Sequence, residues 1–314
     1  MGRRDRVIRG CGFACVIVTL LCSGCVSVGG PLGFIQTAVD PDSRQRQCGS
    51  TASGWPRFER VLIIVFENQN FEDVINDYRF QALAKDGASF THFQGLFHPS
   101  YSNYLAMVSG RKIVTHFDSQ VNVEGPTIGD RLAAKQKTWK NYTEGYPKGL
   151  GCFTGDSLDR YTRKHVPFMS FVNGKKERCE PIANAEEFEK DVRAGSLPHY
   201  AFYSPDLDHD GHDPVGHPRA GLGKAARWLT GFLKQYRPSL KNTLVVVTFD
   251  ESRNDDGVFD NHIYTVFLGD MVKPGEYDTP YNHYNVLATV ADNFGVGRVG
   301  DGDSCAVPIE EVWR

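Results

Sequence analysis

Short apolar runs alternate along the chain with segments in which apolar residues recur at helical spacing. The runs at 61–66 and 244–249 are apolar at nearly every position, as expected of strands covered on both faces of a sheet. Further strand patterns occur at 89–94, 138–142, 199–204 and 265–268. Helical spacing occurs at 71–85, 102–109, 125–136, 184–194, 221–236 and 285–294. The alternation predicts an α/β fold, a three-layer α/β/α sandwich with a mainly parallel central sheet.

The first 25 residues have the pattern of an export signal. Four arginines precede an apolar stretch at 13–21, which is too short to span a bilayer comfortably. The small residues ahead of Cys25 resemble a bacterial lipoprotein cleavage box, although Cys22 stands where such boxes usually carry Leu. This predicts a lipid on Cys25 and a membrane-anchored protein of the cell envelope. An ordinary secretory signal, giving a soluble secreted or periplasmic protein, is the alternative.

Composition separates a tether from a folded domain. Residues 26–55 are rich in Gly, Ser, Pro and polar residues, which predicts a flexible tether, and residues 56–314 form the predicted domain. The formal net charge of −3 shows no basic excess, so the chain is not expected to bind nucleic acid.

Eight cysteines divide into four within the first 25 residues and four beyond them. An exported chain with four remaining cysteines should form two disulfides, for which three pairings are possible. We favour Cys152–Cys179, which closes a local loop, and Cys48–Cys305, which ties the two ends of the chain beyond the export signal together. The four contain no CxxC pair, so these cysteines are not expected to form a zinc site.

Acidic and amide side chains follow the predicted strands at the point where each strand ends. Glu67 and Asn68 follow the first run, Asp250 and Glu251 follow 244–249, and an Asp/His cluster occupies 206–213. In sheets of parallel strands, sites form at the carboxyl ends of the strands. These groups are therefore expected to meet at one edge of the sheet.

Ser100 lies where a loop leads into a predicted helix. Free backbone N–H groups and the helix dipole at such a position favour a phosphate-like anion. Asn103, three residues later, can turn its amide toward the same place. An N-cap without catalytic function is the alternative for a hydroxyl at a helix start, and Ser102 is a nearby rival nucleophile.

Five ordered motifs, at 61–71, 96–110, 206–213, 244–252 and 281–295, together resemble the phosphoesterase family of bacterial phospholipases C and secreted acid phosphatases. This family belongs to the alkaline-phosphatase superfamily, and the resemblance covers residues 57–295. It implies an alkaline-phosphatase-like catalytic domain that transfers phosphoryl groups with the help of a metal. Sulfatases of the superfamily need a C/S-x-P-x-R sequence, which the segment at Ser100 lacks.

The resemblance implies roles for the residues at the strand ends. Ser100 would attack phosphorus and Asn103 would donate to a phosphoryl oxygen. The remaining oxygen groups would bind the metal that activates Ser100. These are Glu67, Asn68, Asp250 and Glu251.

Histidines and further aspartates complete the implied set. Asp208 and His212 resemble a pair that holds a second metal or the substrate phosphate, and Asp210 competes with Asp208 for that role. His283 corresponds to the general acid of the family, although Asn282 stands where the family often has Asp. Lys164 and His165 could reach a substrate phosphate or be solvated loop residues. Weaker candidates are His209, Asp213 and His217, with His262 as the runner-up to His283.

The identity and number of the metal ions stay open. The oxygen-rich first cluster favours Mg, Mn or Ca, whereas the second cluster contains His and allows Zn.

We therefore expect an exported, metal-dependent phosphoric ester hydrolase, most simply an acid phosphatase-type phosphomonoesterase whose substrates include phosphoinositides. The alternative on the same site is a phospholipase C or another phosphodiesterase, with a phospholipid headgroup as substrate. A binding protein without activity is a third possibility. It is disfavoured because a binder needs none of Glu67, Ser100 and Asp250.

Overall fold

The computed structural model describes residue 54 and residues 56–115, 118, 120–172, 175–214, 220–253 and 260–314. The predicted export signal with its lipidation site at Cys25, almost all of the tether, Cys48 and His217 lie outside these residues. No helix within them combines the length and the apolar character needed to cross a bilayer.

In the described part of the chain, eight strands form one sheet in the order β11-β2-β10-β9-β1-β8-β4-β7. Strand β1 (Arg60–Phe66) is central and runs parallel to both neighbours, β8 (Tyr200–Ser204) and β9 (Thr243–Phe249). Strand β10 (Thr265–Leu268) is antiparallel to β9. The sheet is completed by β2 (Ala88–Phe90), β4 (Trp139–Thr143), β7 (Ile182–Ala183) and β11 (Gly275–Tyr277). The predicted mainly parallel α/β sheet is confirmed, with one antiparallel strand that the pattern did not predict.

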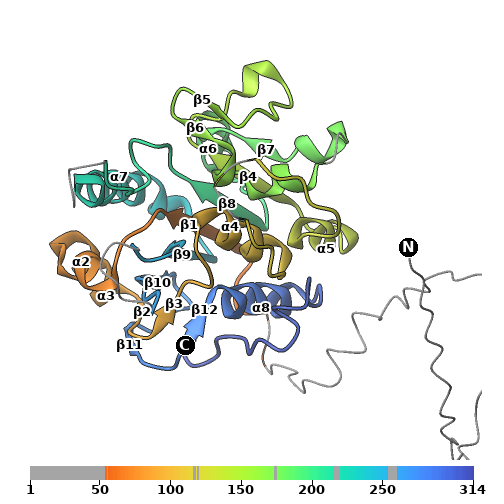
Figure 1. The fold of residues 1–314 in the computed structure, drawn as a ribbon. Helices are drawn as coiled ribbons and strands as arrows, with labels where there is room; N and C mark the ends of the chain where they lie inside the picture. Colours follow the sequence, from red (N-terminus) through yellow and green to blue (C-terminus); the bar gives the residue numbers. More distant parts are fainter. Residues whose placement is uncertain are drawn as a thin grey trace, which may run out of the picture. The chain divides into compact units, whose positions relative to one another are not determined.

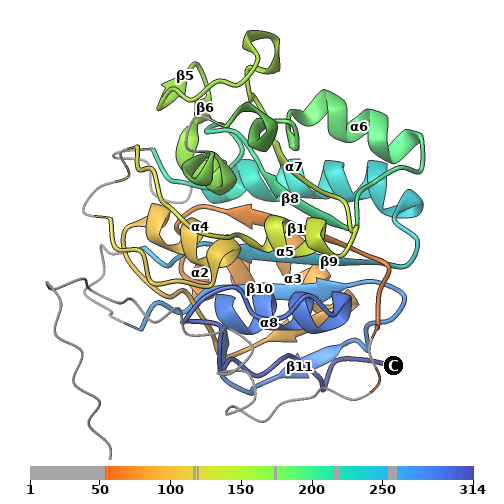
Figure 2. The ribbon, with the colours of Figure 1, turned by 90° about the vertical axis from the view of Figure 1, so that its right-hand side faces the viewer.

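Helices cover both faces of the sheet, as Figures 1 and 2 show. One face carries α4 (Ser100–Ser109), α5 (Ile128–Ala134) and α8 (His283–Phe294). The other face carries α2 (Phe71–Asn76), α3 (Tyr78–Asp86), α6 (Ala185–Arg193) and α7 (Ala220–Tyr236). Short strand pairs and 3-10 helices lie outside these layers: β3 (Phe93–Gln94), β12 (Tyr281–Asn282), β5 (Ser157–Leu158), β6 (Tyr161–Thr162), η1 (Lys148–Leu150), η2 (Arg163–His165), η3 (Pro167–Phe171), η4 (Lys176–Cys179) and η5 (Arg237–Ser239).

Local caps explain where the observed elements differ from the predicted ones. The predicted helix 71–85 is two helices, because the Asp77 side chain accepts from the backbone N–H of Arg79 and starts α3 anew. The helix predicted from 125 begins at Ile128, where Thr127 and Asp130 form a capping box. The predicted strand 89–94 divides between β2 and β3, and β3 pairs with β12 outside the main sheet.

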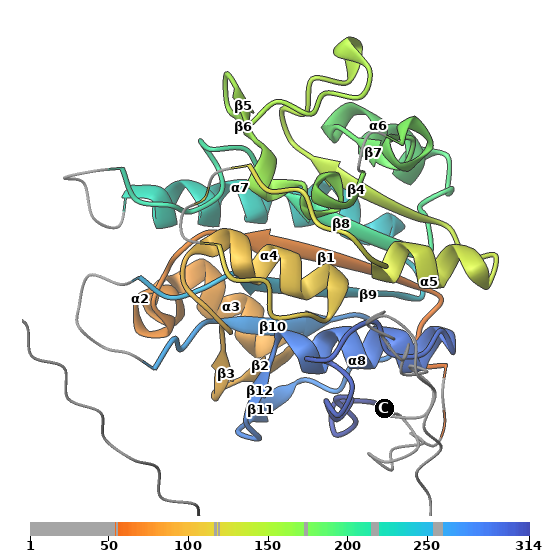
Figure 3. The same cartoon turned by 45° about the vertical axis from the view of Figure 1, so that its right-hand side comes forward.

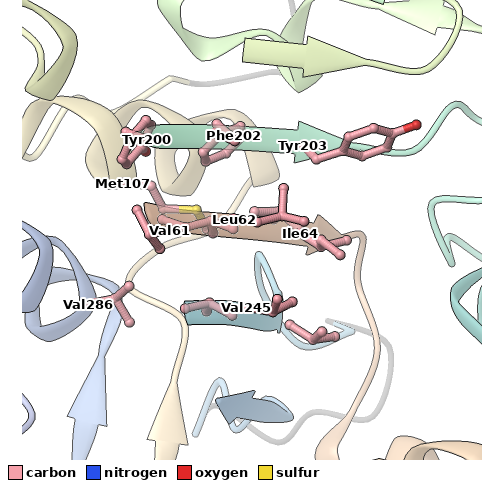
Figure 4. Packing of buried hydrophobic residues seen from close by; sticks show 14 of the residues in the cluster. Val61, Leu62, Ile64, Met107, Tyr200, Phe202, Tyr203, Val245 and Val286 are labelled. Carbon is pink, nitrogen blue, oxygen red and sulfur yellow. The ribbon is translucent and has the colours of Figure 1, made fainter. Parts of the chain in front are cut away.

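The core is built around β1, whose side chains are buried on both faces (Figure 4). Val61, Leu62 and Ile64 lie between the side chains of β8 and β9. Met107 of α4 and Val286 of α8 reach the same cluster. Because both faces are covered, the strand carries no polar side chain after Arg60 until it reaches the rim of the sheet at Glu67.

One of the two predicted disulfides lies in the described part of the chain. Cys152 and Cys179 are bridged, with Cα atoms 5.6 Å apart and a sequence separation of 27 positions. The bridge closes the excursion that contains η2 and η3. Cys305 has no free thiol, and its pairing with Cys48 stays a prediction.

The carboxyl end of α4 is enclosed by the turn at 299–303. Gly110 ends the helix with φ 62°, and its carbonyl accepts from the N–H groups of Gly302 at 2.7 Å and Asp303 at 3.2 Å. The Asp303 carboxylate in turn accepts from the N–H groups of Val299 and Gly300. A Cβ on Gly110 would lie 2.1 Å from Asp303 Oδ1, so only glycine fits here.

Replacing Gly110 with Ala is expected to destabilise the fold more than replacing Gly295, the matched cap of α8, whose φ is 61° and whose added Cβ would meet no atom within 4 Å. Gly295→Ala should cost about 1 kcal/mol, the cost of the left-handed conformation. Gly110→Ala should cost about 2 kcal/mol more because of the clash with Asp303. Urea unfolding of both variants measures the difference, and equal costs would contradict the packing described here.

Candidate active site

Three strand ends meet where β1 stops. The backbone N–H of Glu67 donates to the carbonyl of Asp210 at 2.7 Å, which ties the loop after β8 to β1. The backbone N–H of Asp250 donates to the carbonyl of Phe66 at 2.9 Å, which ties in β9. In Figure 3 the arrow of β1 ends at the side of the sheet on which α4 begins. The residues predicted to follow the strands are therefore assembled at one edge.

Ser100 is the first residue of α4 and is buried against three oxygen atoms. Its Oγ lies 3.3 Å from Glu67 Oε2, 3.1 Å from Asn68 Oδ1 and 3.1 Å from Glu251 Oε1. The Asn68 amide also donates to Glu251 Oε1 at 2.5 Å. One hydroxyl can give its proton to only one acceptor, so the cluster holds more oxygen lone pairs than protein donors can satisfy.

Asp250 adds another buried carboxyl group to this cluster. Its Oδ1 accepts from the backbone N–H of Glu251 at 2.7 Å, whereas the buried Oδ2 has no hydrogen-bond partner among the described residues. Burial and the neighbouring carboxyls of Glu67 and Glu251 raise the pKa of Asp250 well above its usual range. The nearby Ser100 hydroxyl partly offsets this rise in the pKa of Asp250.

These residues fit a divalent cation. A buried carboxylate oxygen without a donor costs free energy, which a cation would recover. The surrounding donors are carboxylate, amide and hydroxyl oxygens, the ligands that hard cations such as Mg²⁺, Mn²⁺ and Ca²⁺ prefer. The residues that would hold the ion are the ones predicted from the sequence: Glu67, Asn68, Ser100, Asp250 and Glu251.

Lys164 and His165 contact Glu67 directly. Lys164 Nζ lies 2.7 Å from Glu67 Oε2, and His165 Nε2 lies 3.0 Å from Oε1. Burial disfavours the charge on Glu67, but Lys164 and His165 outweigh it and hold the pKa of Glu67 well below its usual range. Lys164 Nζ also lies 3.0 Å from Asp118 Oδ2, and Asp118 Oδ1 accepts from the N–H of Tyr101. The structure thus places both residues at the site, where they neutralise a carboxylate of the protein.

The two rival aspartates of the 206–213 cluster lie in different environments. Asp210 is buried, and its Oδ2 lies 3.8 Å from His165 Nε2 without a hydrogen-bond partner among the described residues. Burial, aided by Glu67 and opposed by His165, raises the pKa of Asp210 to about 6. Asp208 lies at the surface, where it pairs with Arg160 at 2.7 Å. His212 is exposed, with its Nδ1 3.0 Å from the carbonyl of Asp213.

A second group of acids and a histidine joins the loop after β8 to the residue that follows β4. Ligand atoms of Glu144, Asp206 and His209 lie within 4.8 Å of one another. His209 Nδ1 contacts both carboxylates, at 2.9 Å and 3.1 Å, and the Trp228 indole donates to Glu144. This group holds the loop that carries Asp210, and it is a further place where a metal could bind.

His283 is placed differently from a general acid. It is buried, and its Nε2 lies 2.8 Å from the backbone carbonyl of Asp250. Burial lowers the pKa of His283 to about 4, so the imidazole is neutral and donates to that carbonyl. This contact helps to fix the end of β9, and the role of His283 as the general acid stays a prediction. The runner-up His262 stacks on Phe71 and contacts the carbonyl of Thr91.

The remaining candidates on α4 are also placed by their hydrogen bonds. Ser102 Oγ contacts Thr115, through both the hydroxyl and the backbone N–H of that residue. Asn103 Oδ1 accepts from the N–H groups of Leu96 and Phe97, and its amide donates to the Phe97 carbonyl and to Glu251. Asn103 therefore shapes the loop ahead of Ser100 in addition to facing the site.

The sequence analysis missed His98. Its Nδ1 lies 2.7 Å from Glu251 Oε2, and the ring is partly exposed. A signal was present, because His98 precedes Ser100 by two residues in the same loop. Asp118, the second partner of Lys164, was missed as well, and no local pattern pointed to it.

Known proteins resemble this chain in sequence and in fold. A model of the Phosphoesterase family matches residues 77–297. A phosphatidylinositol-3-phosphatase of Mycobacterium tuberculosis is 34% identical over 274 residues, covering 85% of this chain and 87% of that protein. A probable acid phosphatase of Kluyveromyces lactis is 32% identical over 270 residues, covering 80% of this chain and 62% of that longer protein. A solved Vibrio parahaemolyticus protein of the alkaline phosphatase superfamily shares the fold, with a TM-score of 0.55 at 14% identity over 83% of this chain and 78% of that one.

Replacing His98 with Ala is expected to lower kcat/KM for p-nitrophenyl phosphate by about 10- to 100-fold, because Glu251 loses the imidazole that orients it. The matched control is His92→Ala, which removes an exposed histidine of the same segment whose Nδ1 contacts the carbonyl of Asp278. Initial rates of both variants give the comparison. Equal kcat/KM values for His98→Ala and His92→Ala would show that the contact between His98 and Glu251 does not contribute to catalysis.

Proposed function

The chain belongs to the Phosphoesterase family, and we propose that it hydrolyses phosphate monoesters at Ser100 through a phosphoserine intermediate. The chain is a phosphoric ester hydrolase, as the family and its phosphatase relatives establish. One observation carries the proposal for the mechanism. It is the buried Ser100 hydroxyl, within 3.3 Å of oxygens from Glu67, Asn68 and Glu251.

The protein residues divide the work of such a reaction. Ser100 Oγ attacks phosphorus and its proton passes to a neighbouring carboxylate, for which Glu251 Oε1 at 3.1 Å is well placed. The bond from phosphorus to the alcohol oxygen breaks, the departing oxygen takes up a proton from water, and Glu251 returns its proton to the solvent. Water then attacks the phosphoserine, which releases phosphate and restores the hydroxyl. The positive end of the α4 dipole favours the charge that develops on the phosphoryl oxygens.

A bound divalent cation would supply Lewis-acid activation of the hydroxyl and neutralisation of the phosphoryl charge. Lys164 keeps Glu67 ionised and thus ready to hold such an ion. The position of Asp210 beside His165 and Glu67 favours Asp210 over Asp208 for a second ion or the substrate phosphate.

The proposed substrates are phosphate monoesters, including phosphoinositides. Support comes from the relative named as a phosphatidylinositol-3-phosphatase, since the match extends over 87% of its length. Export with a lipid anchor on Cys25 is proposed from the sequence of the first 25 residues. The Cys152–Cys179 disulfide supports an oxidising compartment outside the cytoplasm.

Replacing Ser100 with Ala is expected to lower kcat for p-nitrophenyl phosphate by about 10³-fold or more, because the nucleophile is lost. Ser102→Ala is the control, since this hydroxyl lies on the same helix but contacts Thr115. Release of p-nitrophenolate measures both variants. Undiminished activity of Ser100→Ala, or loss only in Ser102→Ala, would refute the assignment. Faster turnover of p-nitrophenyl phosphorylcholine by the wild type would favour a phosphodiesterase instead.

Removing divalent cations with EDTA is expected to abolish hydrolysis, and adding back Mg²⁺, Mn²⁺, Ca²⁺ or Zn²⁺ in turn should identify the ion. Asp250→Asn should raise the ion concentration needed for half-maximal recovery by at least about tenfold, because it removes a ligand. Asp208→Asn should leave that concentration unchanged, because Asp208 lies at the surface with Arg160. Full activity after exhaustive chelation would show that metal dependence is wrong.

A further inference from the structure

A groove of about 1050 Å³ lies between α3 and α7, far along the sheet from Ser100. Its lining includes Thr243, the first residue of β9, and Leu268, the last residue of the antiparallel β10. Both positions belong to the amino end of the parallel strands, whereas Glu67 and Asp250 follow their carboxyl ends. Figure 1 shows α3 and α7 on the same face of the sheet. The groove is therefore separate from the proposed active site.

The floor of the groove is aliphatic. It is formed by side chains of α3, α7, β9, β10 and the segments that follow α7 and β10, most of which are buried. The six residues are Leu83, Leu233, Leu240, Val245, Leu268 and Val272. A small hydrated anion would make no favourable contact with this aliphatic floor. A hydrocarbon chain bound there would be removed from water.

The rim of the groove is cationic. Two acidic side chains, Asp86 and Asp270, face five basic ones, although the whole chain carries a formal net charge of −3. The sign of the charge is thus locally reversed. The five basic residues are Arg79, Lys234, Arg237, Lys241 and Arg314.

Two of the five cations have neither an ion pair nor a hydrogen bond at the charged group among the described residues, whereas the Nε of Arg314 donates to the Val272 carbonyl at 2.8 Å. Arg237 pairs with Asp86, and Arg79 pairs with Asp77 at 3.2 Å. The side-chain ammonium groups of Lys234 and Lys241, both exposed, have no ion-pair or hydrogen-bond partner among the residues that the structure describes. Lys234 lies in the last turn of α7, and Lys241 follows η5. Two ammonium groups at one rim are therefore available to an anionic head group.

We propose that this groove binds a single-chain anionic amphiphile, with the hydrocarbon tail on the aliphatic floor and the anionic head at Lys234 and Lys241. A neutral amphiphile would leave the ammonium groups unpaired, and an inorganic anion would leave the floor exposed to water. The proposal does not depend on the reaction at Ser100, because none of the lining residues belongs to that site.

Isothermal titration of the full chain with laurate, below its critical micelle concentration, tests the proposal. Saturable binding of one laurate per chain is expected. Dodecyl maltoside lacks the anionic head and inorganic sulfate lacks the hydrocarbon tail, so each should bind at least about tenfold more weakly than laurate. Equal affinity for laurate and dodecyl maltoside, or binding of sulfate alone, would overturn the proposal.

Matched variants separate recognition in the groove from a general effect of charge. Lys234→Glu/Lys241→Glu should weaken laurate binding at least about tenfold, and Ala82→Trp, which fills the groove without changing its charge, should weaken it as well. Lys135→Glu/Lys190→Glu makes the same change of charge on α6 and after α5 and should bind laurate as the wild type does. Turnover of p-nitrophenyl phosphate should be unchanged in all three and confirms that they fold. Equal weakening in the control pair would overturn the proposal.

Discussion

The ionised carboxylate of Glu67 is buried at the end of the central strand, and the arrangement of the site depends on the charges that balance it. Burying an unpaired carboxylate is costly, and the usual outcome is that the group takes up a proton. Lys164 and His165 prevent this by contacting both carboxylate oxygens, at 2.7 Å and 3.0 Å. Glu67 can therefore remain charged beside Ser100, where a protonated acid could not hold a cation.

Segments that do not contact the reacting atoms hold Glu67, its two partners and Ser100 in this arrangement. The Cys152–Cys179 bridge encloses η2, from which Lys164 and His165 reach Glu67. The turn at 299–303 encloses the far end of α4, the helix that begins with Ser100. The nucleophile and the charges opposite it are thus held by separate, locally reinforced segments on a rigid sheet.

Much of this arrangement could be predicted, because burial leaves a strong trace in sequence. A strand covered on both faces must be apolar throughout, so β1 and β9 were evident, and the polar residues after them marked the rim. Strand direction leaves no such trace, and the antiparallel β10 was not foreseen. The choice between Asp208 and Asp210 depends on how one loop turns. The contacts of Lys164 and His165 with Glu67 join residues almost 100 positions apart, and only the folded chain reveals them.

The separations along the chain have a further consequence. Asn68 and Glu251, in direct contact, are 183 positions apart, and Ser100 and Glu251 are 151 apart. No contiguous half of the 314-residue polypeptide contains both Asn68 and Glu251, so neither an isolated half nor a chain synthesised only as far as residue 250 can assemble the cluster. Long-range pairings of this kind also close late and slowly during folding. The hydrolytic centre is consequently a product of the whole topology, and its appearance marks the completion of the fold.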